Sequence, residues 1–442
     1  MDIENIKNRD FIVLGIQNWD EKLGSNPRNI SYEFAKQNRV LYVDMPMSKI
    51  RAFMSRRDPQ VKKQLEISKS ESENLSKVDD NIWLLKPKRL NDSINWIPNK
   101  YIFDFLNKNN NKHYAEEIDA AIKKLGFKDV IMFYDNDLFR GFYLKDFLKV
   151  DLFVYYIRDF LSAMDWWKNH GARLEPAILK KADVIVANST YYADYCKQFN
   201  LNSHFIGQGC DVTHFIPEHV NEIPADIQKI KDAEPDKPII GYVGVIYSMR
   251  LDENILLHIA EQRKDWNLVL VGPEDRLFKE SRLHKMKNVH FLGFKDMKYV
   301  PAYMHSFDVC INPQVLNKIT IGNYPLKIDE YLAMKKPVVA THTQAMEFFL
   351  PHVYLAKTVE EYIPVIEDAL TTYTEEKAEA GAAFARSHTW EKNVKAIYKA
   401  INLTYEGLKD EQEVPPQNKV NGSHSKSSLV SSRFQADADL SN

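Results

Sequence analysis

The sequence is poor in cysteine and has no long apolar run. Its 442 residues include three cysteines, Cys196, Cys210 and Cys310, whose spacing fits neither a metal site nor a redox pair, and this favours a reducing compartment. No apolar run approaches the roughly 18 residues that a membrane-spanning helix needs, and the first residues lack the basic-then-apolar pattern of a secretory signal. We therefore expect a cytoplasmic protein, with any membrane contact being peripheral and at the inner face of the cell membrane.

The sequence also lacks an excess of positive charge. It carries 59 lysines and arginines against 61 aspartates and glutamates, a net charge of −2, which argues against a nucleic-acid binder. No Gly-x-Gly-x-x-Gly follows the first apolar run, so a dinucleotide site is not expected there. What is present is an ordinary globular composition, 44% hydrophobic and 27% charged, in a chain long enough for two domains.

The first half of the chain alternates short apolar runs with helical segments. Residues 11–15 are predicted to be a buried strand, 24–29 a loop, the stretch through Tyr32 and Phe34 a helix, and 40–44 the next strand; together they form a βαβ unit. Further strands are predicted at 130–134, 152–156 and 183–187, with helices opening at Glu175 and after Ser189. This alternation indicates an α/β domain over residues 1–216.

Residues 48–103 mix cations with apolar and aromatic side chains. Lys49, Arg51, Arg56 and Arg57 surround Phe53 and Met54, and Trp83, Trp96 and Tyr101 follow. The charges up to residue 80 fit a solvated helix or a mobile loop better than a membrane surface. The aromatic residues add weight to contact with an anionic membrane, because interfacial aromatics and cations suit lipid headgroups.

Polar residues follow two of the predicted strands of this half. Asp135 comes directly after the strand 130–134, and Arg158 and Asp159 follow the strand 152–156. Proteins of the α/β class place their chemistry at the carboxyl ends of parallel strands. Asp159 is therefore a candidate for positioning an acceptor or accepting a proton, whereas His170 is expected to be structural.

The second half begins after residues 217–237, which are rich in proline, glutamate and lysine and are predicted to be a linker. Strands are predicted at 238–244, 267–273, 289–294 and 308–312, the first of them ending in Gly244. Glycine lets a phosphate approach the backbone, and Arg250, just before a predicted helix over 251–262, can bind it bidentately. A plain turn with a solvated Arg250 is the alternative.

The stretch from Thr320 to Thr341 is predicted to form a loop, a helix, a tight turn and a buried strand. Lys327 and Glu330 share one face near the helix N-terminus, while an apolar face is formed by Leu326, Tyr331, Leu332 and Met334. A cation at the positive end of a helix favours an anion, and a carboxylate one turn later can accept hydrogen bonds from hydroxyls. A site that binds both a phosphate and a diol is suited to a nucleotide. The alternative is a surface Lys–Glu ion pair without a ligand.

The spacing of Pro325, Lys327, Glu330-Tyr331-Leu332-Ala333 and Pro337-Val338-Val339 resembles the nucleotide-sugar site of GT-B glycosyltransferases. It is most similar to retaining family 4 and its bacterial surface-polysaccharide, teichuronic-acid-type branch. The resemblance implies an α/β GT-B fold, with two Rossmann-like domains (1–216 and 238–387) facing each other across a cleft and a helix over 388–405 crossing back to the first domain. Residues 406–442 are polar, without apolar periodicity, and are predicted to be disordered.

The resemblance also implies which residues form the site. Donor-nucleotide contacts are expected from Gly244, Pro273, Phe294, Tyr324, Leu326 and Glu330, with Glu330 holding the ribose. The expected catalytic residues are Arg250, Lys327 and Asp159, and the expected acceptor side is formed by Gly24, Ser25 and Asp135. Members of the family often carry a second Glu eight positions before Glu330, facing the donor sugar; here that position is Gly322.

The implied activity is transfer of a sugar from a nucleotide sugar to a hydroxyl of a lipid-linked surface glycan, with retention of configuration and without metal or other cofactor. Asp135-Asn136-Asp137 matches the metal-binding Asp-x-Asp of the other large glycosyltransferase fold, but no nearby carboxylate cluster completes a hard-metal site. Two alternatives are a GT-B-like sugar-nucleotide epimerase and a non-catalytic partner subunit of a glycan-synthesis complex, the latter favoured by Gly322.

Overall fold

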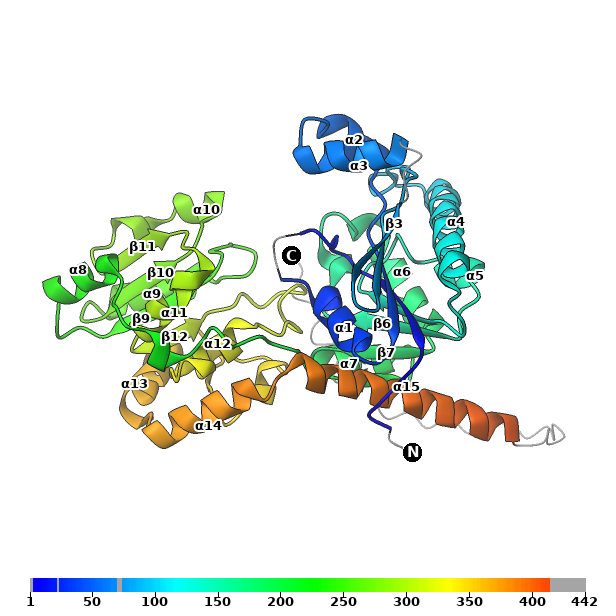
Figure 1. The fold of residues 1–442 in the computed structure, drawn as a ribbon. Helices are drawn as coiled ribbons and strands as arrows, with labels where there is room; N and C mark the ends of the chain where they lie inside the picture. Colours follow the sequence, from blue (N-terminus) through cyan, green and yellow to red (C-terminus); the bar gives the residue numbers. More distant parts are fainter. Residues whose placement is uncertain (1–2, 22–23, 70–73, 414–442) are drawn as a thin grey trace, which may run out of the picture. The chain divides into compact units, whose positions relative to one another are not determined.

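The computed structural model describes residues 3–21, 24–69 and 74–413, and Figure 1 shows its helices and two β-sheets. Both sheets belong to one compact unit that ends at Thr404. In the described part of the chain, no helix is long and apolar enough to cross a membrane. Most of the predicted disordered tail, residues 414–442, lies outside the residues that the structure describes.

The first sheet has the strand order β3-β4-β2-β1-β5-β6-β7-β8. Its strands are β1 (Asp10–Leu14), β2 (Arg39–Val43), β3 (Leu75–Asp79), β4 (Ile82–Leu85), β5 (Ile131–Asp135), β6 (Leu152–Ile157), β7 (Val184–Ala187) and β8 (Ser203–Phe205). β3 pairs antiparallel with β4, and the other neighbours pair in parallel. Every residue of β1, β5, β6 and β7 is buried, as expected of strands covered on both faces of a parallel sheet.

The helices that accompany this sheet differ in length and burial. They are α1 (Asn26–Ala35), α2 (Lys49–Met54), α3 (Pro59–Lys69), α4 (Lys100–Leu125), α5 (Leu144–Phe147), α6 (Lys168–Lys181) and α7 (Thr190–Lys197). α4 begins where Asn99 accepts hydrogen bonds from the N–H groups of Tyr101 and Ile102, and it ends at Gly126, whose φ of 61° is left-handed. Figure 1 shows α2 and α3 side by side, away from the centre of the sheet.

The second sheet has the strand order β11-β10-β9-β12-β13-β14, with all these neighbours parallel. Its strands are β9 (Ile239–Val243), β10 (Asn267–Val271), β11 (Val289–Gly293), β12 (Val309–Asn312), β13 (Val338–Thr341) and β14 (Tyr354–Ala356). The remaining helices are α8 (Ala225–Ala233), α9 (Glu253–Gln262), α10 (Arg276–Lys279), α11 (Val300–His305), α12 (Lys327–Ala333), α13 (Tyr362–Thr372), α14 (Glu375–Arg386) and α15 (Trp390–Glu413).

Alternate residues along the strands of the second sheet belong to two hydrophobic cores, one on each face of the sheet. In β10, Val269 and Val271 belong to one core, which also holds Tyr331 of α12. Leu268 and Leu270 belong to the other, which holds Leu256 of α9. Because side chains alternate along a strand, this division shows that helices cover both faces, which is the arrangement of a doubly wound fold.

The C-terminal helix α15 packs against the first sheet's domain, although the segment before it belongs to the second. Tyr398 stacks on Phe34 of α1 with 5.5 Å between ring centroids, and its hydroxyl accepts a hydrogen bond of 2.9 Å from Asn38. At the start of the helix, a Cβ on Gly209 would lie 2.3 Å from Trp390, so only glycine fits there. The predicted crossover helix is therefore confirmed.

Most predicted strands are confirmed, and four predictions need correction. Residues 75–79 form strand β3, which lies within the stretch 48–80 predicted to be a solvated helix or a mobile loop and pairs with β4. The predicted linker contains α8, whose Ile227 and Ile230 are buried in the second domain's core. α6 begins at Lys168, seven residues before Glu175. The predicted tail starts as helix, since α15 continues to Glu413.

Candidate functional site

Three predicted nucleotide contacts follow the carboxyl ends of neighbouring strands. Gly244 follows β9, Pro273 follows β10 by one residue, and Phe294 follows β11. Gly244 and Gly272 have φ values of 145° and 147°, and a Cβ on Gly272 would lie 1.8 Å from the carbonyl oxygen of Gly244. The two turns touch and leave bare backbone at this edge, while the ring of Phe294 is 71% exposed. Bare backbone and an exposed ring are the surfaces that phosphate and a nucleobase need.

Lys327, the first residue of α12, reaches the same edge. Its Nζ donates a hydrogen bond of 2.7 Å to the hydroxyl of Tyr242 and lies 4.1 Å from the centre of that ring. A Cβ on Gly244 would lie 2.9 Å from this Nζ. The ammonium group therefore stands directly beside the glycine turn, where it can meet a phosphate. The sequence did not single out Tyr242, because a tyrosine inside a buried strand reads as core.

Glu330 lies one turn further along α12 and is half-buried. In the described residues no ion pair joins it to Lys327, so the alternative of a surface Lys–Glu pair is wrong. Burial raises the pKa of Glu330 to about 7, although the positive charge of Lys327 opposes this shift. Within the described residues the Glu330 carboxylate has no hydrogen-bond or ion-pair partner, so it is available for hydroxyl donors.

Tyr324 differs from its predicted role as a nucleotide contact, and Leu326 differs from its predicted place in the apolar helix face. The ring of Tyr324 is buried, and its hydroxyl donates a hydrogen bond of 2.9 Å to Asp329, which also binds His388 Nδ1 at 2.8 Å. The Tyr324 side chain therefore supports α12 from inside and does not face a ligand. Leu326 is 38% exposed, so it is not part of the packed helix face predicted for it, and its exposure leaves it free to contact a nucleotide.

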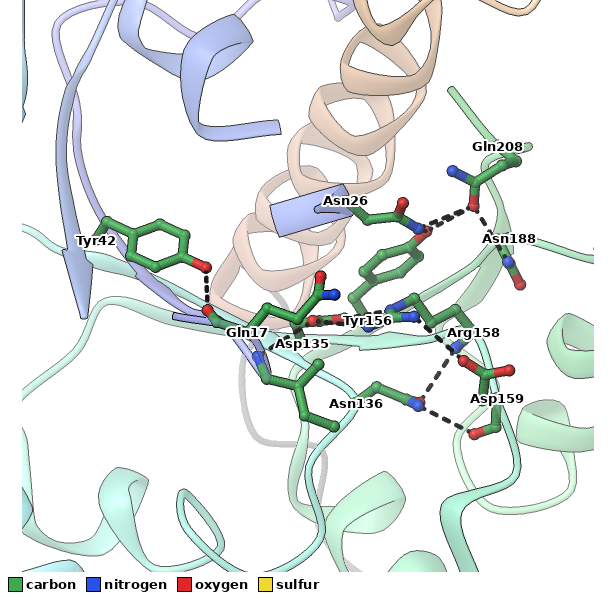
Figure 2. Close-up of polar contacts among 11 residues, drawn as sticks. Gln17, Asn26, Tyr42, Asp135, Asn136, Tyr156, Arg158, Asp159, Asn188 and Gln208 are labelled. Carbon is green, nitrogen blue, oxygen red and sulfur yellow. Dashed lines mark hydrogen bonds and ion pairs between the residues drawn. The ribbon is translucent and has the colours of Figure 1, made fainter. Parts of the chain in front are cut away.

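The first sheet contributes an acidic and basic cluster at its own carboxyl edge (Figure 2). Asp135 at the end of β5 is fully buried and accepts hydrogen bonds from Arg158 Nε at 2.9 Å and from Arg158 Nη2 at 3.3 Å. The same guanidinium reaches Asp159 Oδ2 at 3.2 Å. Burial raises the pKa of Asp159, and the nearby positive charges of Arg158 and Arg250 counteract the rise.

Amide and hydroxyl groups surround this cluster and hold its geometry, as Figure 2 shows. Asn136, at a φ of 53°, accepts a hydrogen bond from the N–H of Arg158 and donates one to the carbonyl of Asp159. Gln208 Oε1 accepts from Asn26 at 3.1 Å and from Asn188 at 3.2 Å. No local sequence pattern indicates this network, because its members lie up to 182 residues apart.

The two aspartates of the Asp-x-Asp sequence point to different partners. Asp135 binds Arg158, whereas Asp137 accepts a hydrogen bond of 2.9 Å from Arg140 and one of 3.2 Å from Trp167 Nε1. Across the described residues, no group of three or more His, Cys, Asp or Glu side chains is placed to hold a metal ion. Each carboxylate charge is instead balanced by an arginine.

One ion pair joins residues of the two sheets' domains. Arg250 Nη2 lies 3.7 Å from Asp159 Oδ1, and the Arg250 side chain is 42% exposed. The structure thus brings two of the three predicted catalytic residues together, while Lys327 stands at the glycine turn.

Of the predicted acceptor residues, Gly24 is exposed and Ser25 is buried as the N-cap residue of α1, without a side-chain capping bond.

Comparison with known proteins shows which family the second domain resembles. Residues 237–369 match the family described as glycosyl transferases group 1. The second domain is therefore similar to group 1 glycosyl transferases. Over 196 residues the chain is 30% identical to a teichuronic acid biosynthesis glycosyltransferase of Bacillus subtilis (strain 168), which covers 41% of this chain. The match spans only 46% of that relative, less than half of its length.

Solved structures extend the likeness over nearly the whole chain. Sucrose-phosphate synthase from Thermosynechococcus elongatus is 16% identical with a TM-score of 0.58, covering 92% of this chain and 99% of its own. The α,α-trehalose 6-phosphate synthase from Burkholderia multivorans is 9% identical with a TM-score of 0.61, covering 94% of this chain and 100% of its own. At these identities the likeness shows the fold, and the fold is GT-B.

In this GT-B chain, the position of the missing second Glu is filled by aromatic rings. Gly322 is buried, and a Cβ there would lie 2.6 Å from Tyr191 Cδ1 and 2.7 Å from Tyr192 Cζ. Both tyrosines belong to α7 of the first domain. Glycine at 322 is therefore required by packing, and the space in front of it is closed by α7.

Substitution of Gly322 is expected to destabilise the protein rather than restore a family contact. Gly322→Ala forces its new methyl group into rings that are themselves buried or packed, and overpacking of this kind costs about 1–3 kcal/mol. Thermal unfolding measures the effect. Gly24→Ala is the matched control, because nothing lies within 4 Å of a Cβ at that position. Equal melting temperatures for the two variants would contradict the packing explanation.

Proposed function

We propose that this chain is a glycosyltransferase that moves a sugar from a nucleotide-sugar donor to a hydroxyl of a surface-glycan acceptor, with retention of configuration. The observation that supports this proposal most strongly is the position of Lys327. Its ammonium group lies beside the turns at Gly244 and Gly272, within the segment that matches group 1 glycosyl transferases. Glu330, one turn further along α12, is assigned to the ribose diol. A structure of the same fold supports UDP as the first nucleotide to test. The Anabaena HepE structure is a complex with UDP and glucose. It is 14% identical to this chain with a TM-score of 0.55, covering 92% of this chain and 100% of its own.

The chemistry follows from where charge develops. When the bond between the anomeric carbon and the phosphate oxygen breaks, the nucleoside diphosphate leaves with the electron pair and its negative charge grows. Arg250 and Lys327 supply positive charge at that place, and such electrostatic stabilisation is commonly the largest catalytic term. The acceptor hydroxyl attacks from the same face, and its proton passes to the departing phosphate oxygen. Asp159 is assigned to positioning the acceptor hydroxyl.

A lipid-linked acceptor at a membrane surface is part of this proposal. Phe53 and Met54 on α2 are 74% and 78% exposed, and Tyr101 and Phe105 on α4 are each 73% exposed. Exposed apolar side chains in this density mark an interaction surface, and the surrounding lysines and arginines favour anionic headgroups.

Acceptor-dependent release of the nucleotide tests the proposed function. With a nucleotide sugar present, free nucleoside diphosphate should appear only when a glycan acceptor is added. Release without any acceptor would favour the epimerase or a hydrolase. No release with a broad panel of donors and acceptors, in a protein that binds nucleotide, would favour the non-catalytic partner subunit.

Turnover is expected to be independent of added divalent metal. Asp135 and Asp137 are each neutralised by an arginine, and the charge of the leaving group is met by Arg250 and Lys327. The initial rate should therefore be the same with and without a chelator. A complete loss of activity that Mg²⁺ or Mn²⁺ restores would make the Asp-x-Asp sequence a metal site.

A further inference from the structure

Two loops at the carboxyl edge of the second sheet are tied to each other. Residues 244–252 join β9 to α9 and carry Arg250, while the loop after the neighbouring strand β12 leads into α12. In that second loop, the N–H of Val315 donates to the carbonyl oxygen of Arg250 at 3.0 Å. In return, the N–H of Asp252 donates to the carbonyl oxygen of Pro313 at 2.9 Å. The loop that carries Arg250 is therefore fastened to the loop that leads into α12.

One side chain adds a bond directly beside Arg250. Asn317 is half-buried, and its Nδ2 donates a hydrogen bond of 2.9 Å to the carbonyl oxygen of Met249, the residue before Arg250. The orientation of this amide is fixed, because Asn317 Oδ1 accepts the N–H groups of Ile319 at 2.8 Å and of Thr320 at 3.1 Å. The amide nitrogen must therefore be the atom that faces Met249.

The loop that carries Asn317 is itself anchored in the second domain. Gln314 Nε2 donates to the carbonyl oxygen of Thr320 at 2.6 Å, and the N–H of Gln314 donates to Thr341 Oγ1 in β13 at 2.8 Å. Gln314, Thr320 and Thr341 are all buried. Side chains locked by packing and by hydrogen bonds hold their neighbours precisely. Asn317 therefore extends from a fixed support toward the loop of Arg250.

Arg250 needs such support from its backbone. Its side chain is 42% exposed, and within the described residues its guanidinium forms one ion pair, the 3.7 Å contact with Asp159. A long, exposed arginine side chain has many rotamers, so the backbone position decides where its guanidinium can reach. Asp275 also holds this loop, because it accepts the N–H of Ser248 at 2.8 Å and its hydroxyl at 2.6 Å. Two different loops thus fix the two residues that precede Arg250.

We propose that Asn317 is a positioning residue for Arg250, the group assigned to the diphosphate of the nucleotide sugar. The inference rests on the proposed glycosyltransferase function and adds a residue to that same site. Asn317 holds the carbonyl group of Met249 and so fixes the backbone from which the Arg250 side chain extends toward the leaving phosphate. In this role Asn317 acts through Arg250 and touches no ligand. Misplacing a catalytic group by 1 Å can cost about a hundredfold in rate.

Calorimetry with UDP tests this inference in two backgrounds. Asn317→Ala and Asn317→Asp both remove the amide that donates to Met249, and Asn317→Asp keeps an oxygen for the N–H groups of Ile319 and Thr320. Arg250→Ala should weaken UDP binding about ten- to hundredfold, the effect of losing a bond to a charged group. Each Asn317 variant should weaken it about tenfold, as part of the same loss. In the Arg250→Ala background, Asn317→Ala should change UDP affinity less than about twofold.

Asn200→Ala and Asn200→Asp are the matched controls. Asn200 is also half-buried; its Nδ2 donates to the carbonyl oxygen of Ala182 at 2.8 Å, and its Oδ1 accepts the N–H of Asn202 at 2.9 Å. It lies in the first domain, between α7 and β8, so equivalent bonds are lost there while UDP affinity should be unchanged. Aspartate at 317 adds a negative charge that itself repels UDP, so the neutral Asn317→Ala shows what the lost bond alone does.

Hydrogen exchange of residues 245–252 provides a second measurement that needs no ligand. Exchange in this segment should be about fivefold faster in both Asn317 variants, the effect of losing one hydrogen bond that holds the loop. The Asn200 variants should leave it unchanged. If Asn317→Ala does not fold, Asn317→Asp is used for both measurements.

Two affinity results would overturn the inference. One is an unchanged UDP affinity in the Asn317 variants while Arg250→Ala weakens binding. The other is an equal loss on Asn317→Ala with and without Arg250, which would show a direct or global effect. If the unaltered protein binds no UDP, the proposed donor is contradicted and hydrogen exchange decides about Asn317: faster exchange supports its hold on the loop of Arg250, and unchanged exchange overturns it.

Discussion

Lys327→Met should reduce the turnover rate about a hundred- to a thousandfold, the usual effect of removing one group that stabilises charge in the transition state. Methionine keeps the length and the apolar stem of the side chain but removes the ammonium beside Gly244. In the protein without ligand, the change breaks the 2.7 Å hydrogen bond to Tyr242, which contributes about 1 kcal/mol. The variant should therefore remain folded while its turnover collapses. Single-turnover kinetics at saturating donor measure the chemical step directly.

Lys335→Met is the matched control for this experiment. Lys335 lies just beyond the end of α12, and its ammonium pairs with Glu218 at 2.9 Å and with Glu379 at 2.6 Å. Surface pairs of this kind contribute about 0–1 kcal/mol, so turnover should be unchanged. If both variants lose activity equally, the effect belongs to the stability of α12. If neither does, Lys327 is not the group that meets the leaving phosphate.

Glu330→Gln should weaken binding of UDP about ten- to hundredfold. A hydrogen bond to a charged group is worth about 1.5–3 kcal/mol, and each 1.4 kcal/mol is about tenfold in affinity. Glutamine preserves the size and the helix propensity of the side chain, so the ligand-free melting temperature should not fall. Titration calorimetry measures the affinity. Unchanged affinity in a folded variant would contradict the ribose contact.

The pH dependence provides an independent measure of the same residue. The pKa of Glu330 rises from its usual 4.5 to about 7 in the folded protein, so between these pH values the folded state holds more protons than the unfolded one. Stability of the ligand-free protein should therefore fall as pH rises from about 4.5 to 7, and less so in Glu330→Gln. UDP affinity should rise over the same window as the carboxylate ionises. The terminal phosphate of UDP also titrates in this window, with a pKa of about 6. Glu330→Gln keeps this phosphate titration and removes that of Glu330, so the difference between the two proteins reports Glu330 alone.

The sequence by itself determined most of the strands and the spacing of the candidate site residues in the second domain. Parallel strands buried on both faces must be continuous apolar runs, so β1, β5, β9 and β10 are visible without coordinates. Glycines after such strands and the spacing of Lys327 and Glu330 are local patterns, and the structure places them at one edge. The role of Leu326 in packing was predicted wrongly, because helical spacing does not reveal where the helix begins.

Only the tertiary structure decided which distant residues share a surface. The β3–β4 hairpin has charged, exposed residues on β3, so no apolar run marked it. Tyr324 looked like a ligand contact until its hydroxyl was seen to bind Asp329. Gly322 looked like a lost function, whereas Tyr191 and Tyr192 occupy the space of any side chain there. The Arg250–Asp159 pair joins segments far apart in the chain, and no local pattern records such a contact, because it forms when separate elements pack together.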